Sequence, residues 1–204
     1  MNAPEAHLVK VCAGMAAFVP RHEPFPAKFK RSADPYQALV RAVVFQQLSG
    51  KAAQTILNRA IAQFDPPFPD PEALVRARET RLREAGLSRQ KIAALKDIAA
   101  KRLDGTIPTA RTLAKLDDEA IVERLTEARG VGRWTVQMYL IFSLGRPDIL
   151  PLDDLGVRKG AGKMLGRELT VKELAAYGER WGPHRSAAAW HCWRAVDTVT
   201  LDAT

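Results

Sequence analysis

The sequence of 204 residues lacks several features that would place it in other classes of protein. Its two cysteines, Cys12 and Cys192, are too few for a disulfide framework or for an iron–sulfur cluster with four cysteine ligands. No Cys/His cluster has the spacing of metal ligands. There is no apolar run of about 18 residues, so no membrane span is expected, and Glu5, His7 and Lys10 make the N-terminus a poor secretory signal. We therefore expect a reduced, cytoplasmic protein with no membrane partner.

Strand signals are also scarce, whereas helix signals are frequent. Asp34-Pro35 and Asp70-Pro71 each combine an N-cap residue with proline at the first helical position. Ser49 and Ser88 are placed to cap the next helices. Short connections between roughly ten helices predict an all-α fold. The clearest expected helices span residues 36–48, 50–64, 89–103, 133–143, 155–165, 171–181 and 186–201.

The chain carries a formal net charge of +8 and an isoelectric point near 9.8. A basic surface favours a polyanionic partner, with DNA or RNA as the first candidates. Simple solubility is an equally good explanation when charge is considered alone. The charge therefore indicates a nucleic-acid partner only if a specific motif supports it.

One motif is Gly130-Val131-Gly132, between two expected helices. Glycine permits a positive φ or the close approach of another backbone, and Val131 can pack between the helices. The helix that follows presents main-chain N–H groups, which bind a phosphate well, and Arg133 adds a charge beside them. The alternative is an ordinary helix C-cap and turn.

The segment LTEARGVGRWTVQ (125–137) resembles the helix–hairpin–helix motif of the DNA glycosylase superfamily, followed by an aspartate segment, ILPLDDLGVRKG (149–160). Three further segments resemble that superfamily in the same order: residues 34–53, 86–99 and 182–194. The last is similar to the closing helix of the branch that excises alkylated bases. The resemblance implies two helical lobes with the active site in the cleft between them. It places the N-terminal segment and the C-terminal helices in one lobe and residues of about 50–150 in the other, within one core over 1–204 and without an additional N-terminal β domain.

The resemblance also implies how the hairpin works. Its main-chain amides bind the DNA backbone, so we expect DNA contacts from Gly130, Val131, Gly132, Arg133 and Thr135. Bifunctional members, which also have lyase activity, place a lysine that attacks the sugar two positions after the second hairpin glycine, and this chain has Trp134 there. A Schiff base needs an amine. We therefore expect a monofunctional hydrolase that leaves an abasic site.

The expected catalytic acid is Asp154, with its neighbour Asp153 as the alternative. A carboxylate stabilises the sugar cation that forms when the glycosidic bond breaks and helps water to attack. An N-cap role would suit either residue. An alkylated purine is cationic and can stack on an aromatic face. The resemblance places Trp134 and Trp193 in the base pocket, with Tyr36 and Trp190 as further walls; each of these aromatics could instead be core.

A glycosylase must extrude its base and fill the gap that is left. The resemblance places the intercalating side chain at the turn near residues 47–49, so Gln47 or Leu48 is the expected wedge. Lys51, Arg89 and Lys91 are candidate phosphate contacts, and a solvated face is the alternative for each.

The predicted function is excision of alkylated purines such as 3-methyladenine from double-stranded DNA by a monomer, associated with the nucleoid if the source is bacterial. No cofactor and no metal bound by side chains are expected. The resemblance leaves open the binding of a monovalent cation by the hairpin backbone. Two alternatives remain: a glycosylase for oxidised, deaminated or mismatched bases, and a helix–hairpin–helix module that binds DNA without catalysis.

Overall fold

The computed structural model describes residues 1–26, 29, 34–64 and 68–196. Within these ranges the chain contains helices and no strands, as the all-α prediction requires. Two compact units are present: residues 1–31 with 140–204, and residues 32–139. None of the helices in the described ranges has the length and apolarity to span a membrane.

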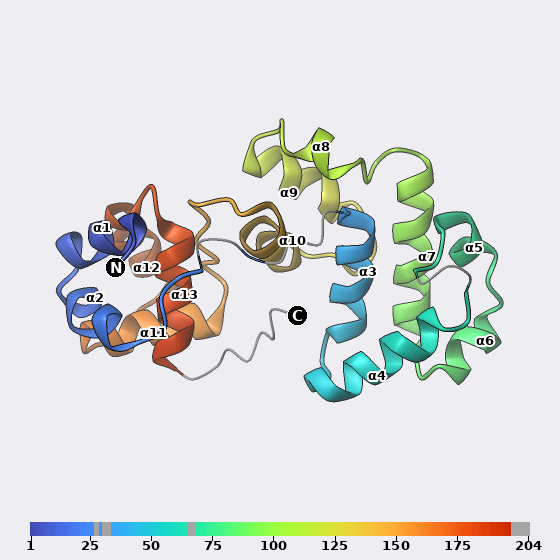
Figure 1. Cartoon of the computed structure of the whole chain (residues 1–204), viewed down its shortest axis with the longest axis horizontal. Coiled ribbons are helices and arrows are strands. Elements are labelled where there is room, and N and C mark those ends of the chain that lie inside the picture. The colour runs from blue at the N-terminus through green and yellow to red at the C-terminus, as the bar shows by residue number, and fades with distance from the viewer. Residues whose placement is uncertain (27–28, 30–33, 65–67, 197–204) are drawn as a thin grey trace. The chain divides into compact units, whose positions relative to one another are not determined.

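The first unit is built from both ends of the chain (Figure 1). Cys192 in its last helix is fully buried, and burial raises the pKa of this thiol. A buried carboxylate, Glu5, accepts hydrogen bonds from the main-chain N–H groups of Asn2 and Phe25, which fixes the segment after the second helix. The elements of this unit are α1 (Ala3–Val11), α2 (Ala13–Phe18), η1 (Val19–Arg21), the π-helix η2 (Leu140–Leu144), α11 (Leu155–Leu165), α12 (Val171–Gly178), η3 (Glu179–Trp181) and α13 (Arg185–Ala195).

The second unit has α7 as its long central helix, packed against α3 and α5 (Figure 1). Leu95 and Ile98 of α7 are buried in its core. It begins at Ser32 and so includes the whole of α3, whereas about residue 50 was expected. Its elements are α3 (Pro35–Phe45), α4 (Gly50–Ile61), α5 (Pro71–Arg76), α6 (Glu79–Glu84), α7 (Arg89–Leu103), α8 (Ala110–Leu113), α9 (Asp118–Thr126) and α10 (Arg133–Tyr139).

Most predicted helix starts agree with the structure. The side chains of Asp34, Asp70 and Ser88 accept capping hydrogen bonds from main-chain N–H groups in the first turns of α3, α5 and α7. Ser49 is at the N-cap position of α4 but its hydroxyl makes no capping hydrogen bond, which corrects that prediction.

Several predicted helices have different extents. The helix expected over 36–48 ends at Phe45, and the one expected over 50–64 ends at Ile61. The helix expected over 171–181 is α-helical to Gly178 and continues as the 3-10 helix η3. The helix expected over 133–143 is α-helical only to Tyr139 and continues as the π-helix η2. The last helix, expected over 186–201, begins at Arg185 and ends at Ala195 within the described residues; positions 197–201 lie outside them.

Candidate functional site

The carboxylate of Asp154 is held at the start of α11. A turn closed by the hydrogen bond from Asp154 N–H to the Pro151 carbonyl (3.1 Å) brings it to the N-cap position. There Oδ1 accepts from the Val157 main-chain N–H at 2.8 Å and from the indole Nε1 of Trp193 at 2.9 Å. Asp154 therefore caps the helix and is bonded to a tryptophan from another helix. This position is compatible with both predicted roles of Asp154, catalytic acid and helix N-cap.

Asp153 differs from its neighbour in environment. It lies in the turn before the helix and is exposed, whereas Asp154 is part-buried. The N-cap interaction belongs to Asp154, although either aspartate could have provided it from sequence. The choice of Asp154 as the catalytic acid stays a prediction, and its fixed orientation favours it.

The bond between Asp154 and Trp193 depends on the close packing of α11 against α13. Gly160 allows this, because a Cβ atom there would lie 1.8 Å from the carbonyl oxygen of Cys192. The distance is far below any van der Waals contact. The N-terminus of α11 is therefore kept beside the indole of Trp193.

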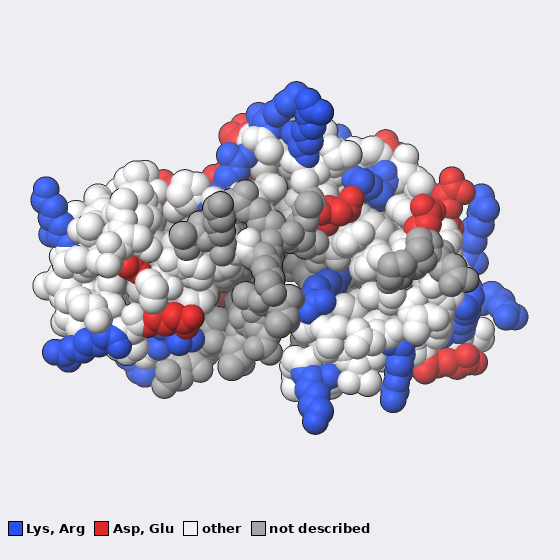
Figure 2. Space-filling model, viewed as in Figure 1, with Lys and Arg blue, Asp and Glu red and all other residues white. Residues whose placement is uncertain are grey.

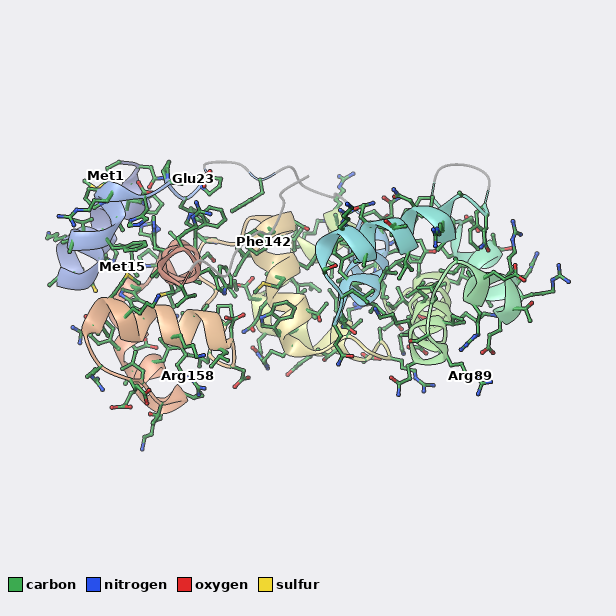
Figure 3. All side chains as sticks on the ribbon, turned by 90° about the horizontal axis from the view of Figure 1, so that it is seen from below. Met1, Met15, Glu23, Arg89, Phe142 and Arg158 are labelled. Carbon is green, nitrogen blue, oxygen red and sulfur yellow. The ribbon has the colours of Figure 1, made fainter. Side chains whose placement is uncertain are left out.

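Trp193 belongs to a cluster of aromatic side chains in the first unit. The ring of Phe142, on η2, lies 5.8 Å from that of Trp193, centroid to centroid (Figure 3). Phe29 contacts both Phe142 and Trp190, at 5.0 and 6.2 Å between centroids. Trp193 is only 4% exposed, as the alternative that it is a core residue predicts, and its indole N–H donates a hydrogen bond to Asp154. Sequence reasoning missed Phe142, which lies in the apolar segment 139–144, and Phe29, which stands between two lysines, because neither local sequence indicates which rings the side chain contacts.

The hairpin, residues 129–132, is held by α7 in the second unit. Gly130 has φ of +77°, and a Cβ there would lie 3.1 Å from the Cβ of Ala94. Arg129 N–H donates to Asp97 Oδ2 at 2.7 Å, so α7 holds the hairpin. Val131 is buried, as expected.

Gly132 is different from Gly130. Its φ is outside the positive range, and a Cβ there would meet no atom within 4 Å. The fold itself therefore has no need of glycine at this position. The absence of a side chain leaves the main chain open to another molecule, as the predicted phosphate contact requires.

The remaining hairpin residues begin α10. Arg133 is exposed and forms an ion pair with Glu119. The side chain of Thr135 is buried, so only its main chain could contact DNA in the predicted way. Trp134 is 45% exposed, which is unusual for so large an apolar side chain and contradicts the alternative that it is core.

The turn between α3 and α4, residues 46–49, contains the two candidates for the wedge, and we call it the lesion-side turn after that prediction. Gln47 has φ of +59° and is the one non-glycine residue with positive φ in the described parts of the chain. Such a conformation is strained and is frequent at functional sites. Leu48 is 38% exposed at the tip, so it is the more apolar candidate for the wedge.

Tyr36 is 3% exposed, its hydroxyl donates to the Pro69 carbonyl at 3.0 Å and its ring packs on Phe68, which favours the alternative that it is a core residue. Lys91 is not directed at a phosphate. Its Nζ donates to the carbonyls of Val44 and Gln46 at 2.7 and 2.8 Å, and desolvation lowers its pKa. Arg89, by contrast, projects into solvent (Figure 3).

The hairpin, with an aspartate capping a helix twenty residues after Trp134, corresponds to a known family. Residues 40–183 match the model of the HhH-GPD superfamily base excision DNA repair proteins. The chain belongs to this HhH-GPD superfamily. The hairpin and Asp154 both lie within the matched residues.

Individual HhH-GPD relatives extend over most of the chain. DNA-3-methyladenine glycosylase 1 of Schizosaccharomyces pombe is 40% identical over 173 residues, covering 83% of this chain and 75% of the relative. The structure of the S. pombe 3-methyladenine DNA glycosylase Mag1 in complex with abasic DNA matches with a TM-score of 0.84 and 36% identity, over 95% of this chain and 96% of that one. A DNA-3-methyladenine glycosidase from Bacillus halodurans matches with a TM-score of 0.81 and 29% identity, over 97% and 91%.

Positive charge is scattered rather than gathered in one patch on the face shown in Figure 2. On the face shown in Figure 2, lysine and arginine side chains are scattered over each unit, with acidic side chains among them. At the hairpin, Arg129 is exposed while Arg133 is paired with Glu119. The main chain of the hairpin is therefore a more specific candidate for DNA contact than a basic patch.

Proposed function

We propose that the protein is a monofunctional DNA glycosylase that removes alkylated, cationic purines such as 3-methyladenine from double-stranded DNA. The observation that carries this proposal is Asp154, whose Oδ1 is oriented by hydrogen bonds from Val157 N–H and Trp193 Nε1. Membership of the HhH-GPD superfamily supports a role in base excision repair. Relatives that match most of the chain are named as 3-methyladenine glycosylases, which supports the substrate class.

In the proposed reaction the bond between C1′ of the sugar and the purine nitrogen breaks, and its electron pair leaves with the base. A base that carried a positive charge departs neutral, so the leaving group needs little activation. The sugar becomes cationic, and the carboxylate of Asp154 stabilises that charge. Water then bonds to C1′ and loses a proton, giving an abasic sugar.

Position 134 supports hydrolysis without lyase activity. Trp134 has no amine, and an imine to the sugar cannot form at this position. Its exposed ring can instead stack on a cationic base, a contact of about 0.5–2 kcal/mol. The hairpin main chain would bind the DNA backbone, and a monovalent cation coordinated there by carbonyl oxygens is part of the proposal.

The experiment is base release from a methylated DNA duplex, with strand cleavage measured in the same samples. We expect free 3-methyladenine by chromatography, strand breaks only after hot alkali, and no covalent complex after borohydride reduction. A borohydride-trapped complex would contradict the monofunctional proposal. Release of oxidised or mismatched bases alone would contradict the substrate class, and DNA binding without any release would favour a non-catalytic module.

Gly132→Ala provides a separate test of the hairpin. The added methyl group meets no atom of the protein, so the free energy of unfolding should change by less than about 0.5 kcal/mol. It would obstruct a phosphate, and a lost charged hydrogen bond of about 1.5–3 kcal/mol corresponds to roughly ten- to hundredfold weaker DNA binding. Binding by fluorescence anisotropy and urea denaturation measure the two effects.

Gly130→Ala is the contrasting variant. Its positive φ and the contact with Ala94 predict a loss of stability that Gly132→Ala does not share. Unchanged DNA affinity in folded Gly132→Ala would show that DNA does not approach the main chain there.

A further inference from the structure

Helix α7 contacts both of the elements that are predicted to touch DNA in the second unit. Lys91, Ala94 and Asp97 are spaced three residues apart and so lie along one face of the helix. Lys91 bonds to the lesion-side turn, Ala94 contacts Gly130, and Asp97 accepts from Arg129 N–H. We call these three residues the α7 face.

Lys91 binds the lesion-side turn at Gln46, the residue directly before Gln47 with its strained backbone. Its Nζ donates to Val44 and Gln46, whose carbonyls end α3, and Gln47 with φ of +59° follows directly. The last carbonyls of a helix have no partners within it, so two bonds from one ammonium fix the end of α3. Lys91 therefore fixes the main chain directly before the strained residue Gln47 and the exposed Leu48.

Gln46 links the same turn to the hairpin. Its Nε2 donates to the Gly130 carbonyl at 2.9 Å, across 84 positions of sequence. The main chain of Gln46 is thus bonded to Lys91, and its side chain is bonded to the hairpin. The turn and the hairpin have fixed positions relative to each other through Gln46 and the α7 face.

We infer that Lys91 is a positioning residue for base extrusion: it keeps the lesion-side turn in place beside the hairpin, so that a side chain of the turn enters the duplex at a set distance from the bound backbone. This role rests on the proposed glycosylase function. Lys91 acts through the protein and makes no contact with the substrate. A misplacement of about 1 Å far from the reacting atoms can cost about a hundredfold in rate.

The chain offers a closely matched control, Lys96. It lies on the same helix, and its Nζ donates to the carbonyls of Val75 and Ala77 at 3.0 and 2.6 Å, at the end of α5. Lys91→Met and Lys96→Met each keep an unbranched side chain and lose two similar hydrogen bonds. Only the first removes support from the lesion-side turn.

The test is single-turnover excision of the same alkylated base opposite thymine and opposite an abasic analogue, where there is no pair to break. Lys91→Met should lower excision opposite thymine by on the order of tenfold or more, with a much smaller loss opposite the abasic analogue. Lys96→Met should change both rates by the same small factor. Equal losses from the two substrates in Lys91→Met would overturn the proposal.

The rate of amide hydrogen exchange in the peptide covering residues 45–50 reports the local stability of the lesion-side turn and does not depend on catalysis. Faster exchange there in Lys91→Met, and not in Lys96→Met, is the expected result; no difference between the variants would overturn the proposal. If wild-type protein releases no base, the proposed function fails, while the exchange result still decides whether Lys91 holds the turn.

Discussion

Asp154→Asn should lower the rate of base excision by about 10²–10³-fold, the loss that follows removal of one oriented electrostatic group from an active site. The amide is neutral and cannot stabilise a sugar cation as a carboxylate does. The excision rate is measured as single-turnover release of methylated purine from duplex DNA.

The substitution separates chemistry from folding. The amide oxygen of Asn can still accept from Val157 N–H and Trp193 Nε1, the two bonds that Asp154 Oδ1 makes. Asn is also among the best N-cap residues. Stability and DNA binding should therefore stay close to wild type, whereas Asp154→Ala should additionally lose about 1 kcal/mol of stability through the cap.

Asp153→Asn is the matched control. It also removes one carboxylate charge, but from the exposed side chain that precedes Asp154 in the sequence. We expect its excision rate to stay within about threefold of wild type, as for a surface substitution. The opposite ranking, with Asp153→Asn inactive and Asp154→Asn active, would exchange the roles of the two residues.

Local signals in the sequence were sufficient for much of the fold. Asp34, Asp70 and Ser88 cap the predicted helices, and the bounds of α7 and α11 agree with the expected ranges. Each of these features depends on residues within one turn of each other. A comparable local signal at the N-terminus was overlooked: Asn2 and Glu5 form a capping box that starts α1.

Tertiary contacts were not predictable in the same way. Tyr36 and Lys91 look like pocket or surface residues in the sequence. A main-chain carbonyl 33 positions away binds the buried Tyr36, and carbonyls 45 and 47 positions away bind the part-buried Lys91. The Asp154–Trp193 bond spans 39 positions and depends on how closely two helices approach. Resemblance to a family placed Asp154 and Trp193 in the site separately, and the hydrogen bond between them comes from the structure alone.

Gly160→Ala should be the most destabilising of the substitutions considered, with a loss of about 3 kcal/mol in the free energy of unfolding, the upper part of the range for overpacked cores. The new Cβ would lie 1.8 Å from the Cys192 carbonyl oxygen and 2.7 Å from its Cα, so the main chain of α13 has to move. Lys159→Ala, an exposed change on the same helix, should stay within about 0.5 kcal/mol. Urea denaturation measures both.

The activity of Gly160→Ala tests whether the hydrogen bond from Trp193 orients the carboxylate of Asp154. Separation of α11 from α13 would lengthen the bond between Asp154 Oδ1 and Trp193 Nε1 while leaving every atom of both side chains present. If this bond orients the carboxylate, excision falls even at temperatures where the variant is fully folded. An excision rate equal to wild type in the folded variant would mean that Asp154 is oriented by its own helix cap to Val157 and owes nothing to α13.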